Sequence, residues 1–597
     1  MAEPQAYVHA TTAAQVAQWL AGVDGAAYVA VDTETAGWDP YADRLLLVQA
    51  CAGPDRPVLV LDATRVDPRA LQTLLGDPGM LKVFHHGSFD LRFLAVAGVE
   101  VRRVADTMLA QQLLDGGEKT DAGVGLAGLA EFRLGMRLDK SVRETFGSPA
   151  PLTGEQLRYA ADDAAATWGV FDQQWRELVG HGLTRVARLE FAALPVLADL
   201  ALRGVAFDAP RWRALVGALE AQLPEVEQRV QAALVTDDSP RDLFGPEPVN
   251  LDSPEQVREA LARTGVHVDG TREALLRDHT DHPAVAAFLH YRQVRKVTTS
   301  WGGDWAERVV HRVTGRVHAD WRQIVGAGRI ACNEPNLTQV PRDADYRACF
   351  GGQPGRALVI ADYSQQELRI LAAVSGDAAL TEVFRRGGDL HATTAAMVFD
   401  VAEESVDAEQ RAAAKQLNFG LMYGMGAPGF ARATGMDVAT AERTMARYFS
   451  AFPKVAAWLA EAEATAKRTG RARTPLGRVR ALTGDGGPPP ASLARNAPIQ
   501  GAGADMTKLA LAEVARRLRD RFGSRGPVAA DGLVLVVHDE LVADVPAGDA
   551  EEAAALVTDG MLAAAREVLG EVPAAVDAAV RPRWGTSESG AHEVTAR

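Results

Sequence analysis

The first 180 residues alternate between short hydrophobic runs and segments with helical periodicity. Between residues 26 and 101 the runs AAYVAVDTE, RLLLVQA, PVLVLDA and LKVFHH have the length and β-branched content of strands. Helical patterning lies between them and continues to about Gly182. Strands that alternate with helices are typical of an α/β domain, so we expect one here, with a boundary near residue 182.

The rest of the chain has a different pattern. Residues 185–202 predict a long helix that opens a new region, and amphipathic helices follow over residues 210–310, broken once at TDDSPRDLFGPEP. We expect an all-helical subdomain there. Two strand signals, at residues 357–364 and 532–545, are separated by mostly helical sequence over residues 376–470. They predict a sheet assembled from distant segments with a helical insertion.

Composition narrows the class of protein. The chain has 597 residues, more than one compact core accommodates, and 47% hydrophobic with 24% charged residues is typical of globular proteins. A net charge of −15 argues against unselective coating of nucleic acid but allows a local basic cleft. Cys51, Cys332 and Cys349 lie too far apart for a disulfide framework or a clustered metal site. Without a signal-peptide pattern or an apolar run of about 20 residues, we expect a cytoplasmic protein.

Acidic residues recur at the ends of predicted elements in the first region. Asp32 and Glu34 alternate on one face of the strand YVAVDTE, and we expect the strand LKVFHHGSFDL to deliver Asp90. Tyr159 and Asp163 are four apart, hence on one helix face. An isolated D-x-E at a strand end is usually a solvated turn, so the prediction depends on the whole set. Four carboxylates without Cys or His are hard oxygen ligands that suit Mg²⁺ or Mn²⁺ in a two-ion site.

A second set of acids lies in the later region. Asp362 ends the predicted strand ALVIADYS, and Asp539 lies in the tight connection between two predicted strands in LVLVVHDELVADV. Only a fold that pairs these strands would bring the two carboxylates together. Either carboxylate taken alone is more simply interpreted as an acid that caps an unrelated strand.

The helical segment between these strands carries an unusual face. Arg411, Lys415, Phe419 and Tyr423 recur at every fourth residue, which predicts one slowly winding side of a helix. A structural helix would place aliphatic residues there. Cations followed by aromatics suit a nucleoside triphosphate, whose phosphates need positive charge and whose base needs a flat apolar surface.

The motifs resemble two known families. The order D-T-E-T, K-V-x-x-x-x-x-F-D and Y-x-x-x-D resembles the 3′–5′ exonuclease family of proofreading polymerases and ribonuclease D. That resemblance implies a ribonuclease H-like α/β fold in which Asp32, Glu34, Asp90 and Asp163 bind metal ions and Tyr159 orients the attacking water. His86 stands where the polymerase relatives commonly carry Asn, which affects fine positioning rather than the metal ligands.

The later region resembles the family A DNA polymerases. ALVIADYSQQELRI, DAEQRAAAKQLNFGLMYGMG and LVLVVHDELVADV are similar to their motifs A, B and C, and TGRVHADW, GRIACNEPNLTQVP, FRRGGDLHATTAAMVF and RNAPIQGAGADMTKLAL follow in the family's order. The resemblance covers the chain from about residue 20 to its end. It implies an α+β right-hand domain with palm, fingers and thumb.

Site roles follow from this second resemblance. It implies that Asp362 and Asp539 bind two Mg²⁺ ions with Glu540 beside them, and that Glu367 lies under the incoming sugar. The other implied contacts to the nucleotide are Arg411, Lys415, His391, Gln365, Phe419 and Tyr423. The implied contacts to the primer-template duplex are Arg329, Asn336, Asn496, Gln500 and His538. Many relatives carry Arg where this chain has Ser492, and the basic stretch at residues 466–480 is expected to contact phosphates.

Taken together, the sequence predicts a DNA-dependent DNA polymerase with a 3′–5′ proofreading exonuclease. The expected domains are residues 1–182 for the exonuclease and 183–597 for the polymerase, with the thumb at about 209–312, the fingers at about 376–480 and the palm formed by the remainder. Expected ligands are primer-template DNA, deoxynucleoside triphosphates and two Mg²⁺ ions per site, with Mn²⁺ able to substitute. We expect a monomer associated with the nucleoid in a bacterium, in DNA repair or replication. Few residues precede Asp32, so a separate 5′ nuclease is expected to remove flaps.

Three alternatives remain at this point. A phage replicative polymerase of the same family is one of them, since such enzymes also lack the 5′ nuclease. A nuclease-only protein would be expected to have lost Asp362, Asp539 or Lys415, and a non-catalytic DNA-binding protein would be expected to have lost acids at both sites. All of these residues are present.

Overall fold

The structure is a computed structural model that describes residues 5–118, 120, 122–148, 151–243, 245–387, 389–482, 487–523, 531–585 and 593–596. Its N-terminal region is built on a six-stranded sheet of order β1-β4-β3-β2-β5-β6. In this sheet β2 runs antiparallel to β3 and parallel to β5. The strands are β1 (Tyr7–Ala10), β2 (Tyr28–Thr35), β3 (Leu45–Cys51), β4 (Val58–Asp62), β5 (Leu81–Phe84) and β6 (Val104–Asp106).

Helices cover both faces of this sheet. The long α6, which begins with a Thr153–Gln156 capping box, packs on β2, β3 and β4 through a small apolar core that includes Ala30, Leu47 and Ala164. The opposite face, with Val31, belongs to the main core of the protein. The helices are α1 (Ala13–Leu20), η1 (Pro68–Leu71), α2 (Gln72–Leu75), α3 (Ser88–Val96), α4 (Thr107–Asp115), α5 (Leu126–Leu134), η2 (Lys140–Gly147) and α6 (Gly154–Gly180).

Helix α7 (Thr184–Arg203) joins the two regions of the molecule. It begins four residues after α6 ends and packs on α3, α4 and β6 on one side and on α21 (Ala491–Phe522), β11 (Asp320–Val325) and β16 (Gly532–Val537) on the other. Because most of its side chains are buried, α7 is part of a continuous core that runs through both regions.

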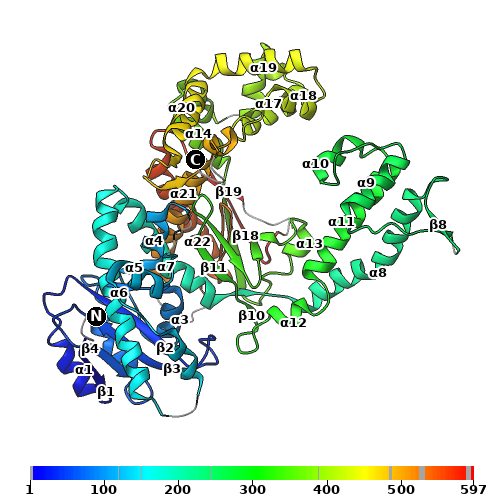
Figure 1. The fold of residues 1–597 in the computed structure, drawn as a ribbon. Helices are drawn as coiled ribbons and strands as arrows, with labels where there is room; N and C mark the ends of the chain where they lie inside the picture. Colours follow the sequence, from blue (N-terminus) through cyan, green and yellow to red (C-terminus); the bar gives the residue numbers. More distant parts are fainter. Residues whose placement is uncertain are drawn as a thin grey trace.

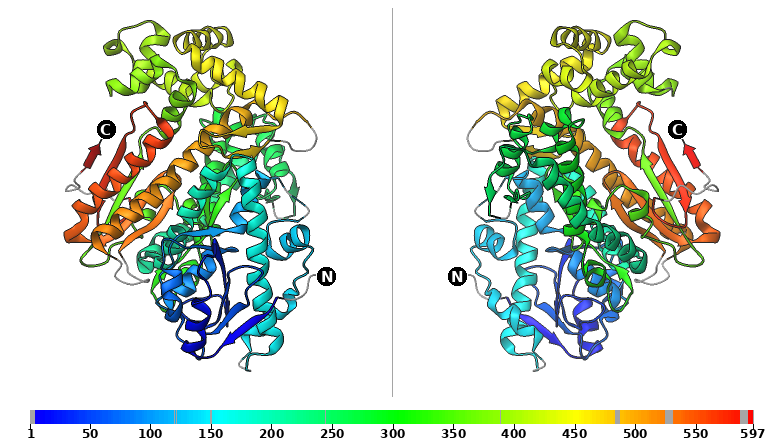
Figure 2. Two further views of the ribbon diagram at one scale, coloured as in Figure 1. Left: turned by 90° about the vertical axis from the view of Figure 1, so that its left-hand side faces the viewer. Right: turned by 90° about the vertical axis from the view of Figure 1, so that its right-hand side faces the viewer.

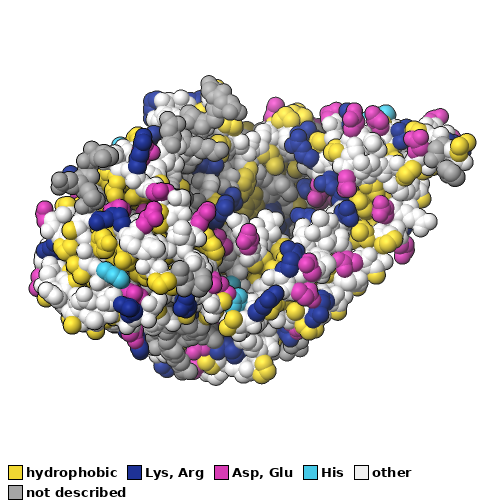
Figure 3. All heavy atoms as spheres, turned by 60° about the horizontal axis from the view of Figure 1, so that its bottom comes forward, with side chains coloured by type: hydrophobic (Ala, Val, Ile, Leu, Met, Phe, Trp, Pro, Cys, Tyr) yellow, Lys and Arg dark blue, Asp and Glu magenta, His cyan; other side chains and the backbone are white. Residues whose placement is uncertain are grey.

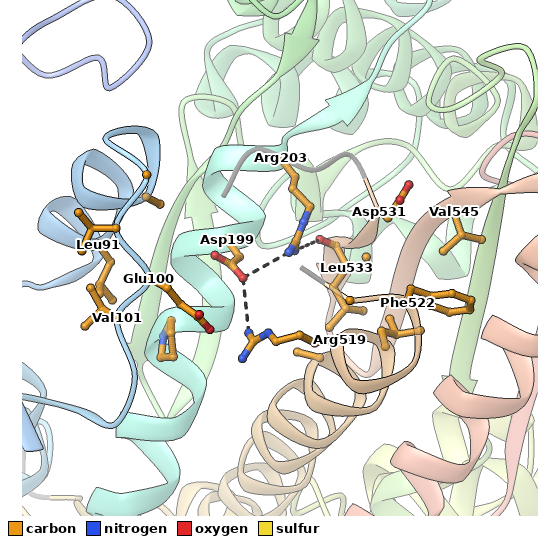
Figure 4. A pocket seen from close by; sticks show the side chains of 18 of the residues that line it. Leu91, Glu100, Val101, Asp199, Arg203, Arg519, Phe522, Asp531, Leu533 and Val545 are labelled. Atoms are coloured by element: carbon orange, nitrogen blue, oxygen red, sulfur yellow. Dashed lines mark hydrogen bonds and ion pairs between the residues drawn. The ribbon is translucent and has the colours of Figure 1, made fainter. Parts of the chain in front are cut away.

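A cavity of about 500 Å³ lies beside α7, where the N-terminal region meets β16 and the end of α21 (Figure 4). In its wall Asp199 Oδ2 lies 3.3 Å from Arg203 Nη2 and 3.9 Å from Arg519 Nη2. Arg203 also donates to the carbonyl of Leu533 at 3.1 Å. These polar contacts therefore connect α7 to both α21 and β16.

Residues 209–310 form an arm that extends away from the rest of the molecule (Figure 1). Its base is anchored by an aromatic cluster in which the rings of Trp212 and Trp305 have centroids 4.8 Å apart, with Phe207, Trp301 and Phe350 around them. The sequence predicts only helices here, which is wrong at the Pro- and Asp-rich patch, where β8 and β9 pair. The elements are α8 (Ala209–Leu234), β8 (Arg241–Asp242), β9 (Gly245–Pro246), α9 (Pro254–Arg263), α10 (Glu273–Leu276), η3 (Arg277–His279), α11 (Pro283–Trp301) and α12 (Trp305–Val309).

The second sheet is assembled from distant segments, as the sequence predicts. Its order is β16-β17-β13-β18-β19, and β13 pairs antiparallel with both β17 and β18. Helices α21 and α22 lie side by side along one face of this sheet (Figure 2). The strands are β13 (Arg356–Tyr363), β16, β17 (Glu540–Pro546), β18 (Val576–Arg581) and β19 (Glu593–Ala596), and the helix that precedes β18 is α22 (Ala550–Leu569).

Short elements connect the arm to this sheet. β10 pairs with β7, and β11 forms a hairpin with β12, two features that the sequence pattern does not reveal. They are β7 (Val205–Ala206), β10 (Arg316–Val317), β12 (Arg329–Asn333), η4 (Leu337–Gln339) and α13 (Ala344–Arg347).

The insertion between β13 and β16 is mainly helical, as predicted, and ends in α21. A short hairpin, β14 (Arg471–Arg473) with β15 (Val479–Ala481), precedes α21. In the part of the chain that the structure describes, no helix has the length and apolar character to cross a bilayer. The helices are α14 (Gln366–Ser375), α15 (Ala378–Arg386), α16 (Leu390–Phe399), η5 (Glu403–Ser405), α17 (Ala408–Gly420), α18 (Ala427–Thr434), α19 (Val438–Ala451) and α20 (Pro453–Thr469).

Candidate active sites

Three of the predicted acidic residues meet at one edge of the N-terminal sheet. Asp32 and Glu34 project from the same face of β2 toward α6, which carries Asp163. The ligand oxygens of these three residues lie within 4.8 Å of one another. The alternation of β2 and the packing of α6 across it therefore bring together residues that are far apart in the sequence.

Asp90 is also close, but it does not come from a strand. The prediction that the strand LKVFHHGSFDL delivers it is wrong, because β5 ends at Phe84 and Asp90 lies in the first turn of α3. His86 adopts a positive φ of 59° between the two elements, which turns the chain. The Asp90 side chain is buried and accepts a hydrogen bond from the Thr33 hydroxyl at 2.6 Å.

The carboxylates of this site repel one another in a buried setting. Burial, and then the nearby Asp163, raises the pKa of Glu34 to about 8, and burial raises the pKa of Asp90 to about 7. Burial followed by Asp90 and Glu34 raises the pKa of Asp32 well above its ordinary value. Positive charge at this point would relieve the repulsion.

The donor set fits a hard divalent cation. All candidate ligand atoms are carboxylate oxygens, and Oδ1 of Asp163 is buried without a hydrogen-bond partner among the described residues. Oxygen ligands of this kind suit Mg²⁺, Mn²⁺ or Ca²⁺ rather than zinc. The site can therefore hold a divalent metal ion.

Two residues that the sequence does not single out lie at the entrance. Lys140 donates to Asp163 Oδ2 at 2.6 Å and to the Tyr159 hydroxyl at 3.2 Å. Arg143 stacks over the ring of Trp38, whose centroid is 4.7 Å from the guanidinium carbon. Neither residue belongs to one of the acidic motifs, and the sequence pattern gives no signal for them.

The second pair of acids meets at one end of the other sheet. Asp362 lies at the end of β13 and pairs in register with Glu540, the first residue of β17. Asp539 lies in the turn before Glu540, directly after His538, which has a positive φ of 60°. Burial, followed by Asp539 and Glu540, raises the pKa of Asp362 to about 8. Two like charges at the end of one sheet are again arranged to accept a cation.

Glu540 is already engaged by the protein. Its Oε1 accepts a hydrogen bond from the Trp584 indole at 2.8 Å, and its Oε2 lies 3.7 Å from Arg347. The guanidinium of Arg347 stacks on the Trp584 ring at 4.3 Å. These contacts fix the position of the Glu540 carboxylate next to Asp362 and Asp539.

A cavity of about 460 Å³ opens beside Asp539. In this cavity the Tyr423 hydroxyl donates to Glu367 Oε2 at 2.8 Å, which joins the start of α14 to the turn that follows α17. The molecule is hollowed between the arm and the rest of the protein, with Lys and Arg side chains along the walls (Figure 3). The predicted site residues that line the cavity are Arg329, Gln365, Glu367, Phe419, Tyr423, Gln500, His538 and Asp539.

Helix α17 presents the predicted cations and one aromatic. Arg411, Lys415 and Phe419 lie on α17, but Tyr423 does not, because the helix ends at Gly420 and Tyr423 lies in the turn that follows. Arg411 is exposed and bonded to Asp389 Oδ2 at 2.5 Å. Lys415 is exposed and makes no ion pair with any described residue.

His391 is a buried residue of α16 rather than part of the cavity wall. Its Nδ1 lies 3.1 Å from Asn418 Nδ2, and its ring centroid lies 5.9 Å from that of Phe419. Burial lowers the pKa of His391, so the ring is neutral near pH 7. In this structure His391 packs against Asn418 and Phe419 of α17 and does not line the cavity.

The predicted duplex contacts are not all in one place. Arg329, Gln500 and His538 line the cavity, whereas Asn336 and Asn496 do not. Asn336 accepts a hydrogen bond from the Thr338 hydroxyl at 2.7 Å. Asn496, on α21, has a buried Oδ1 without a hydrogen-bond partner among the described residues.

The basic stretch at residues 466–480 is only partly free to contact phosphate. Arg478 is 3% exposed and forms ion pairs with Glu190 and Asp505, so the expectation is wrong for this residue. Lys467, Arg468, Arg471 and Arg473 are exposed. Those four side chains remain available on the surface.

Comparison with known proteins agrees with the two predicted domain types. A sequence model of DNA polymerase family A matches residues 219–586, and a model of a 3′-5′ exonuclease matches residues 7–179. DNA polymerase I of Chloroflexus aurantiacus is 31% identical over 98% of this chain and 64% of the relative, and that of Pseudomonas aeruginosa is 32% identical over 95% and 64%. DNA polymerase I of Aquifex aeolicus is 29% identical over 94% of this chain and 96% of its own length. The chain thus spans about two thirds of the first two relatives and nearly all of the third.

A solved structure has the same fold. The POL domain of Pol1 from M. smegmatis, solved in complex with DNA primer-template and dNTP, superposes with a TM-score of 0.80 at 27% identity over 97% of this chain and 99% of that chain. The predicted fold classes, a ribonuclease H-like domain followed by a right-hand domain with palm, fingers and thumb, are confirmed. The chain belongs to DNA polymerase family A and carries a 3′–5′ exonuclease domain ahead of its polymerase domain.

Proposed function

We propose that this protein is a DNA-dependent DNA polymerase that proofreads its product with a 3′–5′ exonuclease, in bacterial DNA repair or replication. The observation that supports this most strongly is the presence of two separate carboxylate sites, one around Asp32, Glu34 and Asp163 and the other at Asp362 and Asp539. A nuclease-only protein would have no use for the second site.

The proposed division of the chain follows the boundary between α6 and α7. Residues 1–182 form the exonuclease domain, and residues 183–597 form the polymerase domain, with the thumb at about 209–312, the fingers at about 376–480 and the palm in the remainder. A protein that copies DNA works at the nucleoid, so we place it in the bacterial cytoplasm. Action as a monomer and a separate 5′ nuclease remain predictions from the sequence.

Divalent cations are part of the proposed chemistry. Two Mg²⁺ ions, or Mn²⁺ in their place, would act at each site as Lewis acids that activate the attacking oxygen and stabilise the leaving oxygen. Asp362 and Asp539 would hold them in the palm. Asp32, Glu34, Asp90 and Asp163 would hold them in the exonuclease domain.

In the polymerase site, the residues around the cavity would bind and orient the nucleotide. The primer 3′ oxygen attacks the α-phosphorus and forms a new oxygen–phosphorus bond. The bond between the α-phosphorus and the pyrophosphate oxygen breaks, and the proton of the primer hydroxyl is released. The exposed ammonium of Lys415 and the guanidinium of Arg411 are suited to the triphosphate, after Arg411 leaves Asp389. Phe419 would contact the base, and Glu367 would lie under the sugar.

The duplex contacts are proposed for side chains of the cavity rim. Arg329, Gln500 and His538, which line the cavity, would contact the minor groove of the terminal base pairs, where the acceptor atoms are common to every correct pair. Asn336 and Asn496 would contact the duplex farther from the reacting atoms. Such contacts report pairing geometry without sequence, as a copying enzyme requires.

In the exonuclease site, water would attack the terminal phosphodiester. An oxygen–phosphorus bond forms to water, the bond to the 3′ oxygen breaks, and that oxygen takes a proton, which leaves a 5′-nucleotide and a DNA strand with a new 3′ hydroxyl. Tyr159, whose hydroxyl lies next to Lys140 and on the helix of Asp163, would orient the attacking water.

Separate inactivation of the two sites tests the proposal. Asp539→Ala should abolish nucleotide addition and leave degradation of single-stranded DNA intact, because it removes a ligand from one site only. Asp32→Ala with Glu34→Ala should have the opposite effect. Equal loss of both activities in either folded variant would contradict the assignment of two sites.

A further inference from the structure

Among the described residues, Lys140 is the basic side chain that forms an ion pair with the exonuclease carboxylates. It begins η2 and reaches Asp163 Oδ2 at 2.6 Å and the Tyr159 hydroxyl at 3.2 Å, with its ammonium 5.1 Å above the centre of the Tyr159 ring. Its side chain is 38% exposed, whereas that of Asp163 is 6% exposed. The ammonium therefore enters the site from the solvent side, where a DNA end would also enter.

The fold does not need this lysine to hold η2 in place. Val142 and Phe146 anchor the segment in the apolar core beneath α6, and the Phe146 ring lies 6.2 Å from that of Tyr159. Asp139 caps the segment by accepting from the Ser141 backbone at 3.0 Å and from its hydroxyl at 2.6 Å. The charged end of Lys140 is thus carried by a segment that is fixed by other contacts.

The charges in the exonuclease site indicate the role of the Lys140 ammonium. Four carboxylates are matched by the four positive charges of two divalent ions, and Asp163 then no longer needs Lys140. A phosphodiester that enters the site brings one further negative charge, spread over its non-bridging oxygens. In phosphoryl transfer, cationic donors at these oxygens stabilise the charge of the transition state.

We propose that Lys140 binds the phosphodiester that is cleaved: once divalent ions occupy the carboxylates, its ammonium leaves Asp163 Oδ2 and donates to a non-bridging oxygen, while it stays beside Tyr159. This inference rests on the proposed exonuclease function. It makes Lys140 a catalytic residue of the exonuclease site, supplied by η2 rather than by the elements that carry the acids.

The test uses the full-length protein with Lys140→Met, Lys140→Arg and the control Arg137→Met. Arg137 is 87% exposed, pairs with Glu131 and lies only three residues earlier. Excision from a labelled single-stranded oligonucleotide, measured in single turnovers, should fall about 10²-fold in Lys140→Met. Lys140→Arg should recover part of that loss, Arg137→Met should match the wild type, and primer extension should be unchanged in all three variants.

Metal binding gives a second readout that does not depend on activity. Mn²⁺ is titrated by electron paramagnetic resonance without DNA, in proteins that also carry Asp362→Asn and Asp539→Asn so that the exonuclease site is observed. Because the ammonium competes with cations for Asp163, Lys140→Met should bind Mn²⁺ at least as tightly as its parent. Weaker Mn²⁺ binding, with excision restored by excess Mn²⁺, would mean that Lys140 only positions the carboxylates for metal binding. That result would overturn the proposal.

The remaining outcomes separate this inference from the proposed function. If the wild-type protein degrades single-stranded DNA and Lys140→Met does so at the same rate, the proposed role of Lys140 is refuted. The proposed exonuclease function is then still supported. If the wild-type protein degrades no DNA with Mg²⁺ or Mn²⁺, the exonuclease function fails, and the role of Lys140 fails with it.

Discussion

Four charged side chains buried where α7 meets α21 and the β14–β15 hairpin provide a quantitative test of how the two regions are joined. Glu190 of α7 accepts hydrogen bonds from Lys508 Nζ at 2.6 Å and from Gln323 at 2.6 Å, and it also pairs with Arg478. Arg478 in turn donates to Asp505 at 2.7 Å. The four charged residues are at most 3% exposed, and their two positive and two negative charges balance.

Glu190→Gln should be strongly destabilising. It leaves this buried cluster with one uncompensated positive charge, and breaking a buried ion pair costs about 3–5 kcal/mol. Total stabilities of about 5–15 kcal/mol are usual, so the loss is a large share. Burial would raise the pKa of Glu190, but Lys508 and Arg478 outweigh it and hold the pKa below its ordinary value. The stabilisation is therefore fully present above the pKa of the unfolded state and is lost as the pH falls through the lower pKa of the folded state.

A double variant makes the test specific. Glu190→Gln combined with Lys508→Met restores the balance of charge, so it should be more stable than the sum of the single losses predicts, by about 2 kcal/mol. The control is Glu513→Gln on α21, whose partly exposed carboxylate pairs with Arg516 at 2.7 Å and with Arg517 at 2.8 Å; the loss of these solvent-accessible pairs should cost at most about 1 kcal/mol.

The assay is urea unfolding of the full-length variants, followed by circular dichroism and tryptophan fluorescence. Free energies of unfolding from the two signals are compared for the single, double and control variants. A loss of less than about 1 kcal/mol in Glu190→Gln, or a double variant no better than the sum of its parts, would refute the reasoning.

Three further predictions concern the ligands. Lys415→Ala should raise the KM for deoxynucleoside triphosphates about 10-fold or more while a gel shift shows unchanged primer-template affinity; the reverse result would assign α17 to the DNA. Glu367→Ala removes the acceptor of the Tyr423 hydroxyl and opens the cavity, so single-nucleotide insertion should show ribonucleotide discrimination reduced about 10-fold or more. Protons on Asp90 (pKa about 7) and Glu34 (pKa about 8) compete with metal, so Mn²⁺ affinity of the exonuclease site should rise from about pH 6 to 9, and a flat profile would contradict this.

The sequence predicts the sites best where a single periodicity places the residues. Asp32 and Glu34 share a face because strands alternate, and Asp362 and Asp539 meet because two strongly hydrophobic strands pair in the palm. Tyr423 departs from its predicted helix because α17 ends at Gly420, three residues earlier. Periodicity alone does not mark where a helix stops.

Features that depend on tertiary contacts could not be predicted in this way. Asp90 follows a turn made by the positive φ of His86, so a continuous strand pattern misplaces it. Arg478 lies in a run of basic residues that is typical of a surface, yet Glu190, 288 residues away, draws it into the interior. Lys140 reaches Asp163 only because η2 packs beside α6. The partners of Arg478 and Lys140 are distant in sequence, and the local pattern carries no trace of them.

The most direct test of the central claim, that one chain holds both a polymerase site and a proofreading site, is primer extension from a mismatched 3′ end with all four deoxynucleotides and Mg²⁺. The wild-type protein should first shorten the labelled primer past the mismatch and then extend it to full length. The variant Asp32→Ala with Glu34→Ala should retain the mismatch in any product it makes. Full-length product that retains the mismatch in the wild type, or shortening without any extension, would show that the chain does not combine the two activities.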